Sequence, residues 1–273
     1  MPQIVAWNIK NQLGDPEKHL DAINAVMPDN PDDWPDVAIF SKAYEEIDTE
    51  FSTVHKTQEI FVDFGYQVVH GLYDDTDGRR DRHGIMAISR LAGEVGLVSL
   101  GSRNAVKITA TDKTTGTDFN VFGIHLDDRS EEQRLRQIDT LLRELVDPDK
   151  PTVIAGDLNA MHGDDTRAML LRLIGKPAGL VKPIEPQDFA ELSGAKRMRK
   201  LPARMASIAV WLSLIAEGSV MRLLEDADFV DTDPAHSPTM SAKRPIAQLD
   251  HIMVSPGFGV VEHNVQPYVG LSN

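Results

Sequence analysis

The stretch VIAGDLNA, residues Val153–Ala160, is the most informative part of this 273-residue sequence. An apolar run of strand-like composition passes directly into Gly-Asp-x-Asn, so a strand is expected to end in a carboxylate and an amide. Side chains two positions apart in an extended chain point to the same side, and a preceding glycine lets a ligand approach the backbone closely. Asp157 and Asn159 can therefore converge on one phosphate or metal ion. The alternative is a capped turn in which both side chains only bind backbone amides.

Three other stretches carry polar side chains where a predicted strand begins or ends. Asn8 lies near the end of QIVAWNIK, His125 lies near the end of FNVFGIHLDD, and Asp250 opens the late strand in LDHIMVSP. We therefore expect the chemistry of this protein to lie at strand ends.

Short runs rich in Val and Ile alternate with turns and helical patterns, which indicates an α/β or α+β fold. Strands are expected at Gln3–Ile9, Val37–Phe40, Tyr66–Leu72, Ile85–Arg90, Ala105–Thr111, Phe119–Leu126, Thr152–Ala155, Leu249–Ser255 and Val260–Tyr268. Helices are expected at Pro16–Met27, Ser130–Val146 and Asp164–Leu173. Ser130 begins a Ser-x-x-Gln pattern that is typical of a capping box. The segment TDKTTGTD, Thr111 to Asp118, separates two strand patterns and predicts an antiparallel hairpin, which favours a mixed sheet.

The composition is that of an ordinary globular protein, with 41% apolar and 26% charged residues. A chain of this length can form one large domain, so a single domain spanning residues 1–273 is expected. The 28 basic and 42 acidic residues give a net charge of −14, which disfavours tight sequence-independent binding of nucleic acid. There is no cysteine, so a metal ion would need oxygen or imidazole ligands.

The N-terminus lacks the pattern of a secretory signal, and a cytoplasmic location is expected. The longest apolar run, Ile208 to Ala216, is far shorter than the roughly 20 residues of a membrane span. We therefore expect no membrane span.

Residues 182–217 are typical of a helical insertion with two parts. The second part, Arg204–Glu217, is apolar on nearly every face, which predicts a helix with Val210, Trp211 and Leu214 buried. The alternative is a lid facing phosphate or lipid, whose positive charge offsets the acidic body. The basic cluster in the first part consists of Lys196, Arg197, Arg199 and Lys200.

Four strand ends carry, in chain order, an asparagine, a histidine, an aspartate with an asparagine, and an aspartate. This order resembles the pattern of the endonuclease/exonuclease/phosphatase family. HGIMAISR, HLDDRSEEQRLRQ, and LLEDADFVDTDP followed by SPTMS are also similar to segments of that family. The resemblance extends over most of the chain but excludes the insertion at 182–217. It implies a four-layered sandwich of two mixed β-sheets flanked by helices. It also implies metal-dependent cleavage of a phosphate ester, with a nucleic-acid phosphodiester as the leading substrate. Phospholipid or small-molecule phosphate esters, or binding without catalysis, are the alternatives.

Position by position, the resemblance implies a Mg²⁺ or Mn²⁺ ion close to Asn8, Asp157 and Asn159. His125 would donate to a non-bridging phosphate oxygen, and Asp157 would orient or deprotonate the attacking water. Asn159 would hold the phosphate or the metal shell, and Asp250 would orient a second histidine. Outside the resemblance, the positive charge of the basic cluster at 196–200 makes it the candidate contact with the substrate.

The first departure from the family pattern concerns the metal. The second core strand of the family ends in a metal-binding glutamate, and DVAIFSKAYEE has Lys42 at that place. An ammonium group cannot bind Mg²⁺, although it can neutralise Asp157. We therefore expect weakened metal binding and impaired activity unless Glu45 or Glu46 substitutes.

The second departure concerns the last strand. Family members finish with a strand that starts with Ser-Asp-His, and this sequence ends at PYVGLSN, where that motif would begin. The C-terminal strand is therefore expected to be missing. His251 cannot easily replace the lost histidine, because neighbours on a strand point to opposite faces. His263 is the remaining candidate.

Overall fold

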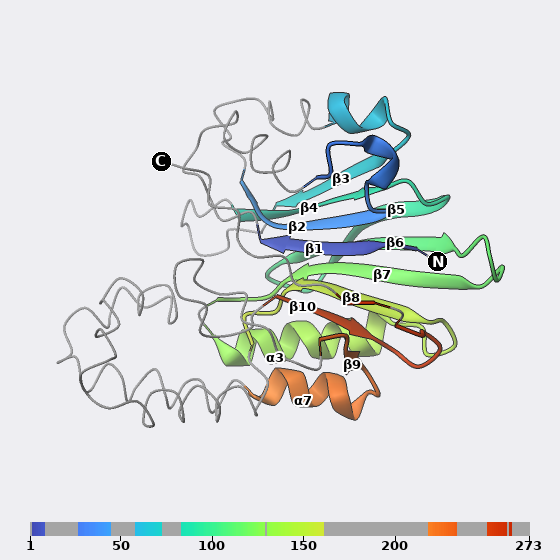
Figure 1. Ribbon diagram of the computed structural model, residues 1–273. Helices are drawn as coiled ribbons and strands as arrows, with labels where there is room; N and C mark the ends of the chain where they lie inside the picture. The colour runs from blue at the N-terminus through green and yellow to red at the C-terminus, as the bar shows by residue number, and fades with distance from the viewer. Residues whose placement is uncertain are drawn as a thin grey trace, which may run out of the picture.

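Two stacked β-sheets form the body of the protein in the computed structural model, which describes residues 2–8, 27–44, 58–72, 83–128, 130–160, 218–233, 250–260 and 262–263. Each sheet contains both parallel and antiparallel pairs of strands. Helices α3, Glu131–Thr140, and α7, Gly218–Asp226, lie side by side beneath the larger sheet (Figure 1). The predicted arrangement of two mixed sheets flanked by helices is confirmed.

The smaller sheet has the strand order β1-β2-β4-β3 and the larger has the order β5-β6-β7-β8-β10-β9. The strands of the smaller sheet are β1 Ile4–Asn8, β2 Val37–Tyr44, β3 Gln67–Leu72 and β4 His83–Ser89. Those of the larger sheet are β5 Gly93–Ser99, β6 Asn104–Thr111, β7 Asp118–His125, β8 Thr152–Asp157, β9 Val230–Asp231 and β10 Asp250–Val254. The structure also contains a 3₁₀ turn at Pro31–Asp33, a π turn at Leu141–Leu145 directly after α3, and helical residues at 58–62.

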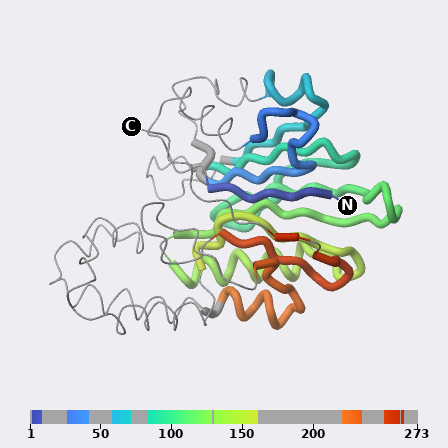
Figure 2. Tube along the Cα trace, viewed as in Figure 1, coloured from blue at the N-terminus to red at the C-terminus, as the bar shows by residue number. Residues whose placement is uncertain are grey.

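Alternate residues of the central strands enter different apolar layers. On β2, Val37 and Ile39 face the other sheet, whereas Ala38 and Phe40 face the outer layer that also contains Phe61. Another layer packs the larger sheet against α3 and α7. The tube in Figure 2 shows the backbone of the two sheets and of the helices beneath the larger sheet as successive layers. Strands buried on both faces explain why the sequence contains continuous runs of Val, Ile and Phe here.

The two sheets approach closely where β7 crosses β2. A Cβ added to Gly123 would lie 2.9 Å from Cδ1 and Cγ2 of Ile39. A residue without a side chain is therefore needed at this crossing, because interiors pack without spare volume.

The local signals at α3 and at the β6–β7 hairpin are confirmed, with one difference. Ser130 Oγ accepts a hydrogen bond from the backbone N–H of Gln133 at 3.3 Å. The backbone N–H of Ser130 donates to Asp127 Oδ1 at 2.7 Å, so Asp127 takes the place expected for the Gln133 side chain. Strands β6 and β7 pair antiparallel up to Thr111 opposite Asp118, as predicted.

Several strand boundaries differ from the prediction. Strand β8 continues to Asp157, and strands β5 and β9 were not predicted, because β5 contains two glycines and β9 has only two residues. The described residues of the predicted strand Val260–Tyr268 are not in a strand, because they follow a turn at Pro256 and Gly257.

Several other predictions lie outside the described residues. These are the helices Pro16–Met27, apart from Met27, and Asp164–Leu173, the insertion at 182–217, and its helix Arg204–Glu217 with Val210, Trp211 and Leu214. Within the described chain, no helix has the length and apolar character needed to cross a membrane.

Gly156 provides a test of the pairing between β7 and β8. Its φ is +134°, and an added Cβ would lie 2.1 Å from the carbonyl oxygen of Ile124. The glycine before Asp157 is therefore required by the neighbouring strand. Gly156→Ala should lower the free energy of unfolding by about 2–4 kcal/mol, measured by urea denaturation.

The matched control is Gly116→Ala in the β6–β7 turn, where φ is +71° but nothing lies within 4 Å of an added Cβ. It should cost only about 1 kcal/mol, from backbone conformation alone. Equal losses in the two variants would contradict the steric explanation for Gly156.

Candidate active site

Polar side chains from five strands meet at one end of the space between the sheets. On β8, Val153 and Ala155 belong to the layer between the sheets, and Asp157 is the next residue on that face. On each of the other four strands, the side chains that face the space between the sheets are likewise apolar until a polar residue at or near the strand end. The five polar residues are Asn8 on β1, Ser41 on β2, His125 on β7, Asp157 on β8 and Asp250 on β10.

Asp157 lies at the centre of this group and has no exposure to solvent. Its Oδ2 accepts a hydrogen bond from Asn8 Nδ2 at 2.7 Å, and His125 Nε2 lies 3.7 Å from the same oxygen. The backbone N–H of Asp157 donates to Ser41 Oγ at 3.2 Å. The Asn8 amide on β1 and the His125 ring on β7 therefore offset the cost of burying this carboxylate, while Ser41 on β2 satisfies the backbone N–H of the same residue.

The turn after β8 differs from the extended geometry expected from the sequence. Asn159 has φ of 48°, in the left-handed region, and its backbone N–H donates to Asp157 Oδ1 at 3.0 Å. Its side-chain Nδ2 donates to the carbonyl oxygen of Leu126 at 2.8 Å. Asp157 thus caps this turn through a backbone N–H, but it also binds the Asn8 side chain, and the Asn159 side chain binds a carbonyl oxygen next to His125.

Arg103 holds the end of β7 from the outside. Its Nη1 donates to the carbonyl oxygens of His125, at 3.1 Å, and Leu126, at 2.6 Å, while Nη2 binds Asp128 at 2.9 Å. On α3, Arg134 Nη1 donates to the carbonyl oxygen of Asp127 at 2.9 Å. Sequence reasoning missed Arg103, because a single arginine between two strands gives no signal of partners more than 20 residues away.

Strand β10 carries two ionisable residues that point in opposite directions. Asp250 pairs in register with Asp157 on β8, at the end of the row that faces the smaller sheet. His251 lies on the other face and is 1% exposed. Its ring binds Asp231 and Ala160 there, which confirms that His251 does not face the site.

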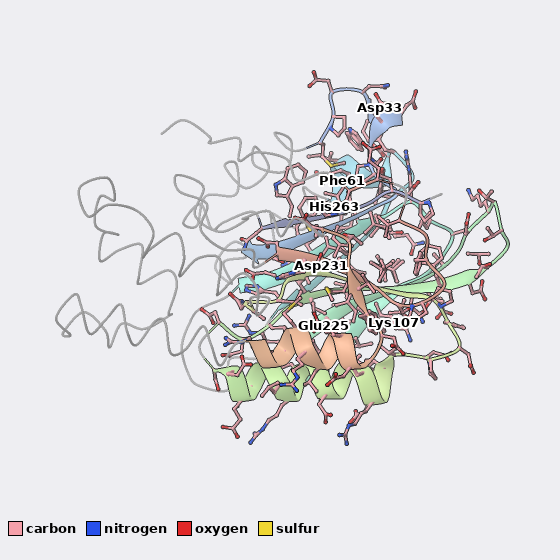
Figure 3. All side chains as sticks on the ribbon, turned by 60° about the horizontal axis from the view of Figure 1, so that its bottom comes forward. Asp33, Phe61, Lys107, Glu225, Asp231 and His263 are labelled. Carbon is pink, nitrogen blue, oxygen red and sulfur yellow. The ribbon has the colours of Figure 1, made fainter. Side chains whose placement is uncertain are left out.

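His263 lies beside the segment that follows β9. Its Nδ1 is 2.8 Å from Thr232 Oγ1, and its Nε2 is 3.9 Å from Asp233 Oδ2. Figure 3 labels His263 together with Asp231 of β9. His263 therefore contacts the residues that directly follow β9.

Lys42 lies in β2, one residue beyond Ser41, which is the register partner of Asn8. Ser41 pairs with Ile85 and Ala43 pairs with Gly84, so Lys42 is the extra residue of a β-bulge. Its backbone is adjacent to the site, whereas its side chain lies outside the described part. The other predicted residues outside the described part are Glu45, Glu46, Lys196, Arg197, Arg199 and Lys200.

The oxygen atoms of Asn8 and Asp157 at the site are the type of ligand that a hard divalent cation binds. Asn8 Oδ1 is buried and has no hydrogen-bond partner among the described residues, beside the carboxylate of Asp157. Amide and carboxylate oxygens are the ligands that Mg²⁺ prefers. In the described ranges, however, no group of three or more His, Asp or Glu side chains is placed to hold a metal ion. The oxygens of Asn8 and Asp157 are nevertheless of the kind that a divalent cation prefers.

The model of the Endonuclease/Exonuclease/phosphatase family matches residues 5–272. Solved structures similar to this chain include a protein of that family from Bacteroides vulgatus, 14% identical, covering 93% of this chain and 87% of that chain with a TM-score of 0.53.

Two further structures have the same fold. A protein of that family from Leptotrichia buccalis is 14% identical and covers 93% of this chain and 88% of that chain, with a TM-score of 0.51. A mannosyl-6-phosphatase from Bacteroides thetaiotaomicron is 13% identical and covers 94% and 86%, with a TM-score of 0.50. No curated protein matches the sequence.

The His251 ring is held between two acceptors in the interior. Burial lowers its pKa, but the hydrogen bond to Asp231, the negative charges of Asp231 and Asp250, and the bond to Ala160 together raise the pKa above its ordinary value of 6.5. Because a carboxylate and a carbonyl both accept hydrogen bonds, each ring nitrogen must carry a proton to satisfy them. The charged imidazolium is the form that fits this position.

The raised pKa of His251 predicts a pH-dependent contribution to stability. The folded state binds this proton more tightly than the unfolded chain, so the contribution is complete below 6.5 and is lost as pH rises through the raised pKa. The difference in unfolding free energy between the unaltered chain and His251→Gln should therefore shrink with rising pH, by up to about 1.4 kcal/mol per unit. Urea denaturation between about pH 6 and pH 9 measures it. A difference that stays constant or grows over this range would contradict the charged form.

Proposed function

The chain belongs to the endonuclease/exonuclease/phosphatase family, and on this premise we propose that it is a divalent-metal-dependent phosphoester hydrolase. The reaction takes place at the end of the space between the sheets where Asp157 lies. One observation carries the proposal: Asn8 Nδ2 and His125 Nε2 both approach Oδ2 of the buried Asp157, at 2.7 and 3.7 Å. A carboxylate, an imidazole and amides within one small volume can bind a phosphate and activate a water molecule.

Each side chain has a distinct role in the proposed reaction. Asp157 orients the attacking water and accepts its proton, while Asn8 fixes the Asp157 carboxylate through its Nδ2 donor. His125 donates to a non-bridging phosphate oxygen, where negative charge develops. Asn159 holds the phosphate, and Asp250 adds a carboxylate on the β10 side.

A divalent cation would supply positive charge next to the phosphate oxygens. Asp157, Asn8 and Asn159 are the residues that would hold it, and the buried Asn8 Oδ1 is the amide oxygen available for this purpose. Lys42 stands where the family pattern has a metal-binding glutamate, and an ammonium group cannot serve as a ligand. Binding of Mg²⁺ or Mn²⁺ is therefore proposed to be weak and turnover slow.

A nucleic-acid phosphodiester is the first proposed substrate, and the basic cluster at 196–200 is the proposed contact with it. A small-molecule phosphate ester is the second candidate. The net charge of −14 favours this second candidate, because it repels a long polyanion more strongly than one phosphate group. The likeness in fold to the mannosyl-6-phosphatase is consistent with either substrate, because one fold serves many substrates.

The proposed catalytic groups can be tested by paired substitutions. With Mn²⁺ present, His125→Gln and Asp157→Asn should each lower kcat by about 10²–10⁴-fold, because each removes proton transfer or charge stabilisation. Rates are measured on single-stranded DNA, RNA, a sugar phosphate and a choline phosphodiester lipid.

The control for this series is Asp118→Asn. This carboxylate lies at the opposite end of β7 and binds Thr111, so its loss should leave kcat unchanged. Hydrolysis that survives both site substitutions would place the reaction elsewhere. Hydrolysis of the sugar phosphate alone would select the second candidate.

Lys42→Glu tests the proposed reason for weak metal binding. The exchange alters the local charge by two units and restores the family ligand, so Mn²⁺ should bind at least about tenfold more tightly in calorimetric titration. Lys113→Glu is the matched control, because it makes the same charge change in the exposed β6–β7 turn. Tight Mn²⁺ binding and rapid turnover by the unaltered chain would contradict the proposal and point to Glu45 or Glu46 as ligands.

A further inference from the structure

The turn that carries Asn159 is held from behind by a buried ion pair that the proposed reaction does not use. His251 Nδ1 lies 2.7 Å from Asp231 Oδ2, and His251 Nε2 lies 3.0 Å from the carbonyl oxygen of Ala160. The imidazole has no solvent exposure and the Asp231 side chain has 7%. Asp231, labelled in Figure 3, belongs to β9, which follows α7 directly.

The Asp231 carboxylate is itself fixed. Its Oδ1 accepts a hydrogen bond from the backbone N–H of Asp233 at 2.9 Å, while Oδ2 binds His251. Because both acceptors of the ring lie in the interior, the imidazolium cannot turn away without leaving one of them unsatisfied. The pair therefore fixes the distance between β9 and the Ala160 carbonyl.

Three hydrogen bonds define the turn from Asp157 to Ala160. Asp157 Oδ1 accepts from the Asn159 backbone N–H, Asn159 Nδ2 donates to the Leu126 carbonyl, and the Ala160 carbonyl accepts from His251. Asn159 has φ of 48°, a conformation that persists only where its surroundings hold it. The bond from His251 acts at the far end of the turn. Its donor, His251, has no proposed contact with the substrate.

We propose that His251 is a positioning residue for phosphoester hydrolysis. Anchored by Asp231, its ring holds the Ala160 carbonyl and thereby keeps Asn159 and Asp157 in the orientation that the reaction needs. This inference rests on the proposed function. A displacement of about 1 Å at a reacting group can cost about 10²-fold in rate, so one hydrogen bond at this turn is sufficient to matter.

Two amide substitutions separate the two bonds of the ring. The Gln amide can place a donor where Nε2 lies, so His251→Gln keeps the bond to Ala160. The shorter Asn amide reaches the position of Nδ1, so His251→Asn keeps the bond to Asp231 and loses the bond to Ala160. His251→Phe keeps a ring of similar size and loses both bonds.

His263→Phe is the control for a merely structural effect. His263 also binds residues next to β9, Thr232 and Asp233, but it has no bond to the Asp157–Ala160 turn. It should lose stability without altering the turn.

The first measurement does not require activity. Amide hydrogen exchange of Asn159, followed by NMR, should be at least about tenfold faster in His251→Phe and His251→Asn than in the unaltered chain. It should be close to the unaltered rate in His251→Gln and His263→Phe. Equal exchange in all five proteins would overturn the proposal.

The second measurement is steady-state kinetics on the substrate that the unaltered chain hydrolyses. His251→Phe and His251→Asn should lower kcat by about 10–100-fold with KM changed less than about threefold, and His251→Gln should recover most of the loss. An equal loss of kcat in His263→Phe, or no recovery in His251→Gln, would overturn the positioning role. If the unaltered chain hydrolyses no phosphoester, the proposed function fails, and the exchange of Asn159 alone decides whether His251 holds the turn.

Discussion

A carboxylate without solvent exposure, that of Asp157, is the constraint on which the arrangement of this protein depends. An ionised group can remain in the interior only if donors surround it, since its hydration is lost. Asn8 Nδ2 and the backbone N–H of Asn159 donate to the Asp157 carboxylate, and His125 Nε2 lies 3.7 Å from it. Ser41 accepts a hydrogen bond from the backbone N–H of Asp157. The packing of the two sheets against each other therefore also determines where the polar site forms.

The sheets can supply these partners because they pack closely. The absence of a side chain at Gly123 allows β7 to approach Ile39, and Gly156 allows β8 to pair beside Ile124 immediately before Asp157. Behind the site, the Leu126 carbonyl accepts hydrogen bonds from both Arg103 and Asn159. The ends of β7 and β8 are thus joined to each other and held from outside, which gives the site a rigid frame, as a preorganised reaction centre requires.

The chain combines a family scaffold with an altered charge pattern at the proposed metal site. The scaffold belongs to the endonuclease/exonuclease/phosphatase family, whose members generally use a divalent metal. The site has the amide and carboxylate oxygens that such an ion prefers, but Lys42 occupies the bulge of β2 next to it. Because ligands of opposite charge determine how tightly a cation is held, the proposed exchange of a metal-binding glutamate for Lys42 would weaken metal binding. Membership of the family therefore shows the fold of this protein but does not by itself show its activity.

The sequence by itself determined where most of the central strands form and which face each of their residues takes, because successive side chains of a strand point to opposite faces. It therefore placed Asn8, His125, Asp157 and Asp250 at strand ends and put His251 on the face opposite Asp250. It also predicted the cap of α3 by Ser130 and the β6–β7 hairpin, since both depend on neighbouring residues. Only the tertiary structure decided that Ser41, 116 positions from Asp157, binds its backbone, and that Asp231 and Ala160 bind His251. A local pattern fixes the direction of a side chain, but its partner is set by strand register and sheet packing, which join segments far apart in the chain.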